Sequence, residues 1–295
     1  MMKSSPSLKN SARTVLSFFV IASLICGCSS STSPTYFKEN IEKSIQDICR
    51  DEYKIDIKTK LAGRTLWIYL AVEDLFEKAD KPEKYFEKFE ITDNEAEFKD
   101  GSLQLKYLIK AIPEKERLQQ YKYNKGVFEK INKVWRVIRR ITFSMAHSGK
   151  TEPQFFCLVT ADIKNGFETK ETFYYLDLKK VSYEYISWNE YQHRTVNETN
   201  ISPEIIGDKE GLHLDYKDIT LDNFVAAQIQ HRIKLKFEKP EVDKNADIDK
   251  EILKIAVYTI RTYGFRDFTT AELNNLLTQN RVILNRAAVW ARPID

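Results

Sequence analysis

The chain is poor in glycine, proline and cysteine. Its 295 residues include 9 Gly, 8 Pro and 4 Cys. A turn-rich all-β barrel or a disordered chain needs more glycine and proline than this, so both classes are disfavoured. No internal repeat of fixed period is present either. The aromatic fraction of 12% instead suits a folded domain with a well-filled core.

A long apolar run is also missing. Near the start, Val15–Ile25 is apolar, but a membrane-spanning helix needs about 20 residues to cross roughly 30 Å of hydrocarbon. The run follows Lys3, Lys9 and Arg13, and a positive segment before a short apolar one is typical of a signal peptide. We therefore expect residues 1–27 to be a signal peptide.

The next residues fix the expected cleavage point. Ile25-Cys26-Gly27-Cys28 resembles the lipobox of bacterial lipoproteins, with an aliphatic residue at −3 and a small one at −1. The resemblance implies cleavage after Gly27 and a lipid on Cys28 that anchors the protein to the membrane. Ser29 at the second mature position is similar to lipoproteins sorted to the outer membrane, where the domain would face the periplasm. The alternative is an ordinary secretory signal with a coincidental cysteine. Residues 28–35 then form a lipidated, flexible tether.

The mature chain carries no net charge. The full chain has 46 basic and 43 acidic side chains, and residues 1–27 hold three of the basic ones and no acidic one. The mature chain therefore has 43 of each. Nucleic-acid-binding proteins usually carry a basic face or stripe, so we expect no nucleic-acid partner. The expected partners are the membrane, through the lipid on Cys28, and an envelope protein.

Two cysteines, Cys49 and Cys157, remain as thiols once Cys26 is removed and Cys28 is lipidated. An exported protein lies in an oxidising compartment, so a disulfide between them is one prediction. The other is two separate buried thiols, because sequence does not fix the distance between them.

The sequence predicts two units, each made of a helix followed by a two-stranded β-hairpin. Apolar residues spaced by three and four indicate helices over 35–51 and 125–147. The expected hairpin strands cover 53–60 and 65–72 after the first helix, and 154–163 and 170–176 after the second. This pattern favours an α+β fold, with an antiparallel sheet and helices packed on one face.

The segment between the two units is rich in Lys and Glu. We expect Glu73–Asp100 to be a surface excursion with short helical pieces at 73–89. Its aromatic side chains either anchor this long loop or form a partner-facing patch. Alternation from Leu103 to Ile109 then predicts a strand.

The remaining chain divides into a first domain, a linker and a C-terminal region. The expected α+β domain covers 36–195 and ends in short helices at 177–185 and 187–194, the latter capped by Ser187. Residues 196–218 are expected to be a polar loop or linker. The last region, 219–295, is expected to pack on the same core. Its predicted features are a helix capped by Thr220, a helix capped by Asp247 or Asp249, and terminal strands near 265–268 and 282–290.

One helix face offers a binding surface. Lys130, Lys133, Arg136, Arg139 and Arg140 lie opposite the apolar stripe of the 125–147 helix. Near a membrane, such a face could touch anionic lipid or cell-wall polymer. The sequence favours the alternative, a solvated face whose charges pair with neighbouring acids.

Sequence signatures of catalysis are absent. No GxSxG, HExxH, CxxC or GxGxxG occurs, so we assign no catalytic residue, metal or cofactor. His213, Asp215 and Asp218 place an imidazole and carboxylates at short spacing, which could serve a metal or an acid–base pair. Ordinary acids of a surface loop explain them as well. The sequence favours a non-catalytic binding or assembly module of the envelope. The alternative is an exported hydrolase of cell-wall or lipid material.

Overall fold

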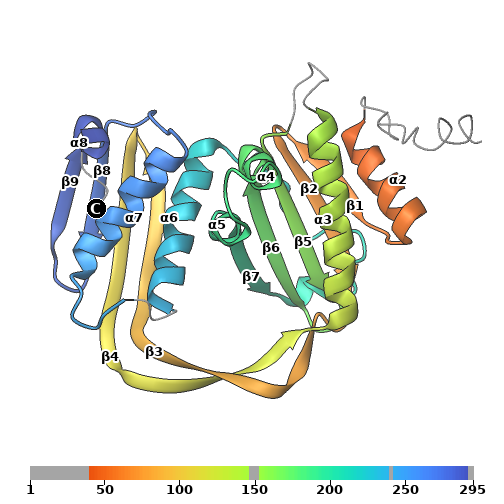
Figure 1. The fold of residues 1–295 in the computed structure, drawn as a ribbon, viewed down its shortest axis with the longest axis horizontal. Coiled ribbons are helices and arrows are strands. Elements are labelled where there is room, and N and C mark those ends of the chain that lie inside the picture. Colours follow the sequence, from red (N-terminus) through yellow and green to blue (C-terminus); the bar gives the residue numbers. More distant parts are fainter. Residues whose placement is uncertain (1–39, 146–152, 239–241, 292–295) are drawn as a thin grey trace, which may run out of the picture. The chain divides into compact units, whose positions relative to one another are not determined.

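The structure is a computed structural model that describes residues 40–145, 153–238 and 242–291. All of these belong to one compact unit, Lys38–Asp295. The expected signal peptide, Cys28 and the tether lie outside the described residues. The predicted α+β class is confirmed, with two mixed sheets that are largely antiparallel (Figure 1).

A five-stranded sheet contains the two predicted hairpins. Its order is β1-β2-β5-β6-β7. The strands are β1 (Lys58–Ala62), β2 (Thr65–Val72), β5 (Phe155–Asp162), β6 (Phe167–Tyr174) and β7 (Val196–Ile201). The hairpins β1–β2 and β5–β6 meet through a parallel pairing of β2 with β5, and the other neighbours are antiparallel.

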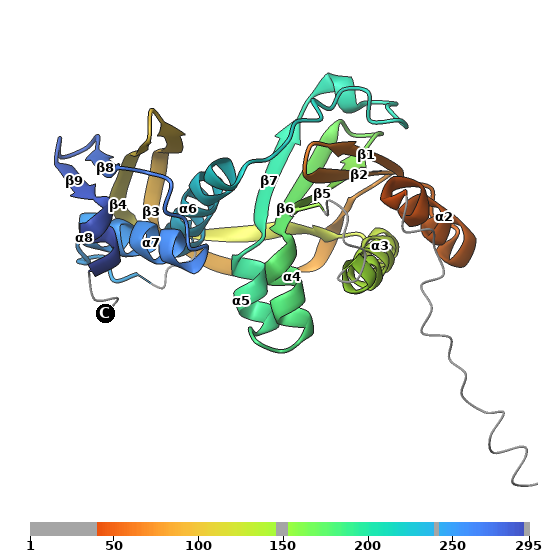
Figure 2. The same ribbon diagram turned by 90° about the horizontal axis from the view of Figure 1, so that it is seen from above.

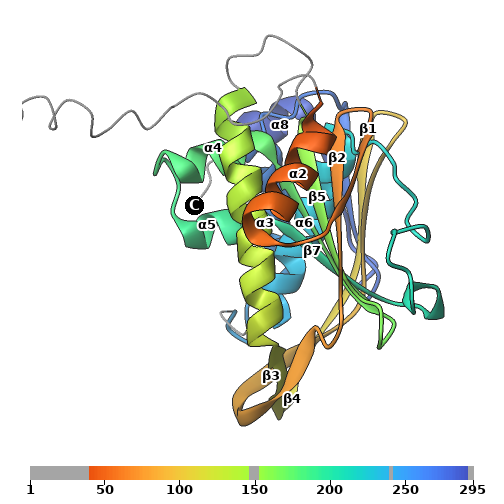
Figure 3. The same cartoon turned by 90° about the vertical axis from the view of Figure 1, so that its right-hand side faces the viewer.

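Helices α2 (Ile41–Tyr53) and α3 (Lys125–Met145) cover one face of this sheet (Figures 2 and 3). The prediction of two helices before the two hairpins is confirmed. The alternation that follows the first helix predicts a strand over 53–60, but the strand begins only at Lys58. The helix continues to Tyr53 and ends at Lys54, whose φ of 57° turns the chain. Arg140 of α3 donates to both carboxylate oxygens of Glu52 on α2, at 2.9 and 2.7 Å.

The opposite face of the sheet is covered by the loop after β7. Trp67, Tyr69 and Cys157 pack there against Ile205 and neighbouring apolar residues of this loop. The indole Nε1–H of Trp67 also donates to the Lys217 carbonyl at 2.9 Å. Both faces of β2 are therefore covered, as its continuous apolar run predicts. The predicted loop or linker at 196–218 is wrong for 196–201, because these residues pair with β6 as β7.

Two short helices connect β6 to β7. They are α4 (Tyr175–Ser182) and α5 (Trp188–His193), close to the predicted positions. The Ser187 side chain caps α5 by accepting from the Glu190 amide at 3.1 Å, as expected. This cap sets the position of α5, which faces α6 in the site described below.

A four-stranded sheet, ordered β3-β4-β8-β9, replaces the predicted surface excursion. Its strands are β3 (Phe76–Lys99), β4 (Ser102–Tyr123), β8 (Thr270–Asn275) and β9 (Arg281–Asn285). The helical pieces expected at 73–89 are wrong, because residues 76–89 belong to β3. The first half of β3 pairs only with the end of β4, in a ribbon whose side chains are mostly exposed. Lys and Glu therefore alternate there with no buried face to give an apolar pattern.

Three helices pack on the four-stranded sheet. They are α6 (Leu221–Glu238), α7 (Ile248–Thr262) and α8 (Arg286–Ala291). The helix α6 begins directly after Thr220, and Asp247, not Asp249, caps α7 through the Lys250 amide at 3.1 Å. The strand expected near 282–290 is confirmed for 282–285, which lie in β9, and the one expected near 265–268 is wrong. Phe265 and Phe268 are buried outside any strand, and residues 286–291 form α8.

The helix α6 contacts both sheets. The side-chain amide of Asn94 on β3 donates to the Gln230 backbone carbonyl at 2.9 Å, and the Gln230 side-chain amide donates to the Asn94 backbone carbonyl at 3.2 Å. Two residues earlier, Gln228 donates to the Arg194 carbonyl between α5 and β7, at 2.5 Å. These bonds hold α6 between β3 and the segment after α5, so that one face of α6 lies opposite the helices of the five-stranded sheet. Among the described helices, none combines the length and apolar character needed to cross a membrane.

Candidate functional site

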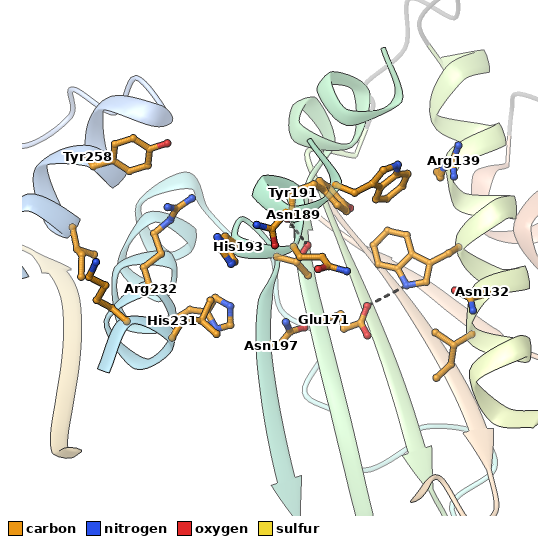
Figure 4. A pocket seen from close by; sticks show the side chains of 18 of the residues that line it. Asn132, Arg139, Glu171, Asn189, Tyr191, His193, Asn197, His231, Arg232 and Tyr258 are labelled. Atoms are coloured by element: carbon orange, nitrogen blue, oxygen red, sulfur yellow. Dashed lines mark hydrogen bonds between the residues drawn. The ribbon is translucent and has the colours of Figure 1, made fainter. Parts of the chain in front are cut away.

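A cleft of about 930 Å³ lies between the helices of the two sheets. One wall comes from α3 and α5, the facing wall from α6 and α7, and the floor from β6 and β7 (Figure 4). Clefts of this size and mixed lining are the usual form of small-ligand sites. It is therefore the candidate site of the molecule.

Glu171 of β6 lies on the floor of the cleft. Its Oε2 accepts a hydrogen bond from the indole Nε1–H of Trp135 on α3, at 3.1 Å (Figure 4). Burial disfavours the charged carboxylate and raises the pKa of Glu171 to about 7, although the Trp135 hydrogen bond opposes this shift. Glu171 therefore exchanges its proton near neutral pH.

Aromatic side chains form the first wall. Trp135 rests on Phe173 at a ring distance of 4.4 Å, and Tyr191 meets both Trp135 and Trp188 edge-on, at 6.1 and 5.6 Å. Trp188 is 50% exposed at the rim of the cleft. The Arg139 guanidinium lies 5.2 Å from the centre of the Trp188 ring, within cation–π range. This wall offers a rigid apolar platform with a cation beside it.

The facing wall carries His231, Arg232 and Tyr258. His231 is only 8% exposed, and its Nε2 has no hydrogen-bond partner among the described residues. Burial, followed by the neighbouring charge of Arg232, lowers the pKa of His231 to about 4, so the imidazole is neutral at pH 7. Arg232 is held by Glu190 at 3.4 Å and lies 5.1 Å from the Tyr258 ring centre. A neutral imidazole and an oriented guanidinium thus face the aromatic wall.

Exposed amide side chains complete the lining. They come from α3, α5 and β7, and they are Asn132, Asn189, Gln192 and Asn197. Each amide both donates and accepts hydrogen bonds. The cleft therefore presents many neutral polar groups besides its charged ones.

Positive charge predominates in the cleft. Lys236 and Lys254 both approach Glu251, at 3.9 and 3.4 Å. Arg136 and Arg139 of α3 form no ion pair within the described residues. These two arginines belong to the basic helix face that the sequence singles out, and they lie along the cleft. Arg140, from the same face, instead pairs with Glu52 of α2.

His213 does not form the site with Asp215 and Asp218 that their spacing suggests. Its Nδ1 lies 2.6 Å from Asp208 and its Nε2 lies 2.8 Å from Glu168 of β6. Burial opposes the charged imidazole, but the two carboxylates outweigh it and raise the pKa of His213. Because both ring nitrogens are occupied, His213 holds the covering loop against the sheet and has no nitrogen left for a ligand.

The two aspartates near His213 have other partners. Asp215 pairs with Lys217 at 2.5 Å on the surface. Asp218 accepts from the Arg64 amide at 2.8 Å and from the Thr65 hydroxyl at 3.0 Å, which fastens the end of the loop to the start of β2. No group of three or more His, Cys, Asp or Glu side chains in the described residues is placed to hold a metal ion.

Cys49 and Cys157 are free, buried thiols. Cys49 belongs to α2 and Cys157 to β5, where the Thr172 hydroxyl lies 3.7 Å from its sulfur. Burial raises the pKa of each thiol to about 12. Of the two predictions, the structure agrees with separate thiols.

Sequence reasoning missed most of the cleft. Its residues come from 128–139, 171, 188–197, 231–236 and 251–258, and no short motif links them. Only the basic face of α3 gave a signal. Comparison of the chain with protein-family models, with curated proteins and with solved structures found no match.

Proposed function

We propose that the protein is an envelope lipoprotein, anchored by a lipid on Cys28, that binds a ligand in the cleft between α3/α5 and α6/α7 without transforming it. The lipobox at Ile25–Cys28 supports the anchor. The cleft supports binding, because its polar lining is large and incompletely satisfied.

One observation carries the binding role. Three side-chain nitrogens on the two facing walls lack a hydrogen-bond partner among the described residues: Nε of Arg139, Nε2 of His231 and Nε of Arg232. Buried polar atoms are nearly always paired, and an unpaired one costs about 1–3 kcal/mol. All three atoms are buried, so a polar ligand between the walls would pair with them once these side chains rotate toward the cleft.

The anchor is tested by mass spectrometry of the mature N-terminus. We expect the wild-type chain to begin at Cys28 with acyl chains attached, and Cys28→Ala to retain its leader without lipid. An unacylated wild-type N-terminus would contradict the anchoring.

The cleft is tested with three probes from the envelope: a soluble cell-wall digest, a total lipid extract and solubilised envelope proteins. We expect one fraction to produce a saturable change in tryptophan fluorescence, since Trp135 and Trp188 line the cleft. Asn197→Trp, which fills the floor, should abolish it. Thr199→Trp, two residues along β7 and outside the cleft lining, should not. A response that both variants retain would place binding elsewhere.

A second candidate is an exported hydrolase of cell-wall or lipid material. The observation favouring it is Glu171, because a carboxyl group with a pKa of about 7 suits general acid–base work. Glycoside hydrolysis commonly needs two facing carboxyl groups, and the other acid in the lining, Glu251, lies beside two lysines. Turnover of either the cell-wall digest or the lipid extract by wild type, lost in Glu171→Gln, would establish this alternative.

A further inference from the structure

We infer that the ligand of the cleft is an acidic carbohydrate chain, stacked on the Trp188 wall and hydrogen-bonded to the amides and to His231. The inference rests on the proposed binding function and names the class of ligand for it.

Trp188 of α5, at the rim of the cleft, is the surface on which we expect a sugar ring to stack. A pyranose ring presents C–H groups on its faces, and the face of an indole carries negative potential that attracts them. Trp188 is half exposed, and Tyr191 contacts it edge-on at 5.6 Å from the interior. Holding such a large apolar side chain at the mouth of a polar cleft suits a ligand with both apolar and polar surfaces.

The hydrogen-bonding groups suit hydroxyls. A sugar hydroxyl donates one hydrogen bond and accepts others, and so do the amides of Asn132, Asn189, Gln192 and Asn197. The neutral imidazole of His231 adds an unpaired Nε2, which is buried in the facing wall and would reach a hydroxyl after a rotation of the ring. A simple anion only accepts hydrogen bonds, and an acyl chain forms none. Either of these ligands would leave most of the groups without a hydrogen bond, and each unpaired group would reduce the binding free energy.

Charge and size select an acidic chain over a single sugar. Arg136 and Arg139 lie along α3 without an acidic partner among the described residues, so a carboxylate or similar acid on the ligand would pair with them. A volume of about 930 Å³ lies at the upper end of the range for small-ligand sites, so several linked rings fit better than one.

The test is calorimetric titration of the full-length, anchored protein in detergent with two probes of equal length. One is an oligomer of a uronic acid and the other is an oligomer of an uncharged hexose. We expect the acidic oligomer to bind about tenfold more tightly at low salt. Arg136→Gln combined with Arg139→Gln should remove that preference.

The stacking platform has a matched control. Trp188→Ala should weaken binding of the acidic oligomer at least tenfold. Tyr185→Ala should leave it unchanged, because Tyr185 is 80% exposed just before α5 and outside the cleft lining. Both positions are exposed, and equal melting temperatures for the variants would confirm that folding is intact.

The outcomes separate this inference from the proposed function. Absence of binding by both oligomers, or equal binding of the two, overturns the acidic carbohydrate. If lipid extract or an envelope protein then binds and Asn197→Trp blocks it, the binding role stands with another ligand. If no probe responds, both fail.

Discussion

Trp135 donates its indole N–H to Glu171 across 3.1 Å and so joins α3 to the floor of the cleft. The bond has two consequences. It fixes the indole between Phe173 and the cleft, and it stabilises the carboxylate form of an acid that burial pushes toward the neutral form. The binding surface and the acid on its floor are thereby built as a unit.

Glu171 should make stability depend on pH in a defined direction. Its folded-state pKa of about 7 exceeds the ordinary 4.5, so between these values the folded state holds a proton that the unfolded chain has lost. Stability therefore falls as pH rises through this window. Glu171→Gln cannot ionise and should be more stable than wild type at pH 8, by about 1–3 kcal/mol, with little difference near pH 4. Urea unfolding at both pH values measures this.

The control for Glu171 is Glu129→Gln, an exposed position on α3. We expect its unfolding free energy to track that of wild type at both pH values. If Glu171→Gln were also no more stable than wild type at pH 8, the carboxyl group would not be buried as described.

His213, on the other face of the sheet, should also make stability fall as pH rises, in this case because a protonated imidazole stabilises the fold. Folding raises its pKa above the ordinary 6.5, because it lies between Asp208 and Glu168. The stabilisation is fully present below pH 6.5 and is lost as pH rises through the folded-state pKa. Asp208, whose pKa is lowered, adds stability that is present above pH 3.8 and lost as pH falls through its folded-state value.

Replacement of His213 should therefore cost most in mildly acidic solution. His213→Gln leaves two buried carboxylates without their cation, and we expect a loss of about 2–3 kcal/mol at pH 6, smaller at pH 9. His193→Gln, at an exposed site on α5, is the control and should lose little at either pH. A pH-independent loss in His213→Gln would show that the imidazole acts through packing alone.

The cysteines give a chemical check on both the fold and the anchor. Cys49 and Cys157 are buried with pKa values raised to about 12, so neither should react with a thiol reagent at pH 8 in the folded protein. In guanidinium chloride, two thiols per purified, anchored chain should react. No reactive thiol after unfolding would show a disulfide, and more than two would show that the leader or an unmodified Cys28 is retained.

Sequence patterns predicted elements well where burial repeats regularly along the chain, on one side of a helix or on both faces of a strand. The stripes of α2 and α3 and the continuous apolar run of β2 all reflect burial that is regular along the element. The cleft lacks such regularity. Glu171, Trp188 and His231 are each one residue of an otherwise ordinary strand or helix, and only the packing of α6 opposite α5 brings them together.

The strand predicted over Leu103–Ile109 is confirmed as the first part of β4, but β3 and the rest of β4 were missed for a different reason. Their ribbon half is exposed on both sides, and cross-strand pairs such as Lys84–Glu116 at 2.7 Å replace apolar contacts. A local signal was nevertheless present. Asp-Gly flanked by extended segments favours a two-residue hairpin turn, and Asp100-Gly101 joins β3 to β4 with φ values of 51° and 72°.

That turn supplies a test of the corrected topology. Gly101→Ala places a side chain at a φ of 72°, where the nearest atom to the added carbon is the Thr269 hydroxyl at 3.8 Å. Space is therefore available, and the cost comes from the backbone alone, about 1 kcal/mol. Gly126→Ala is the matched control, because Gly126 lies in the first turn of α3 without a positive φ, where alanine is favoured. Thermal unfolding should show a lower melting temperature for Gly101→Ala and an equal or higher one for Gly126→Ala. Equal behaviour of the two variants would contradict a β3–β4 hairpin turning at Asp100-Gly101.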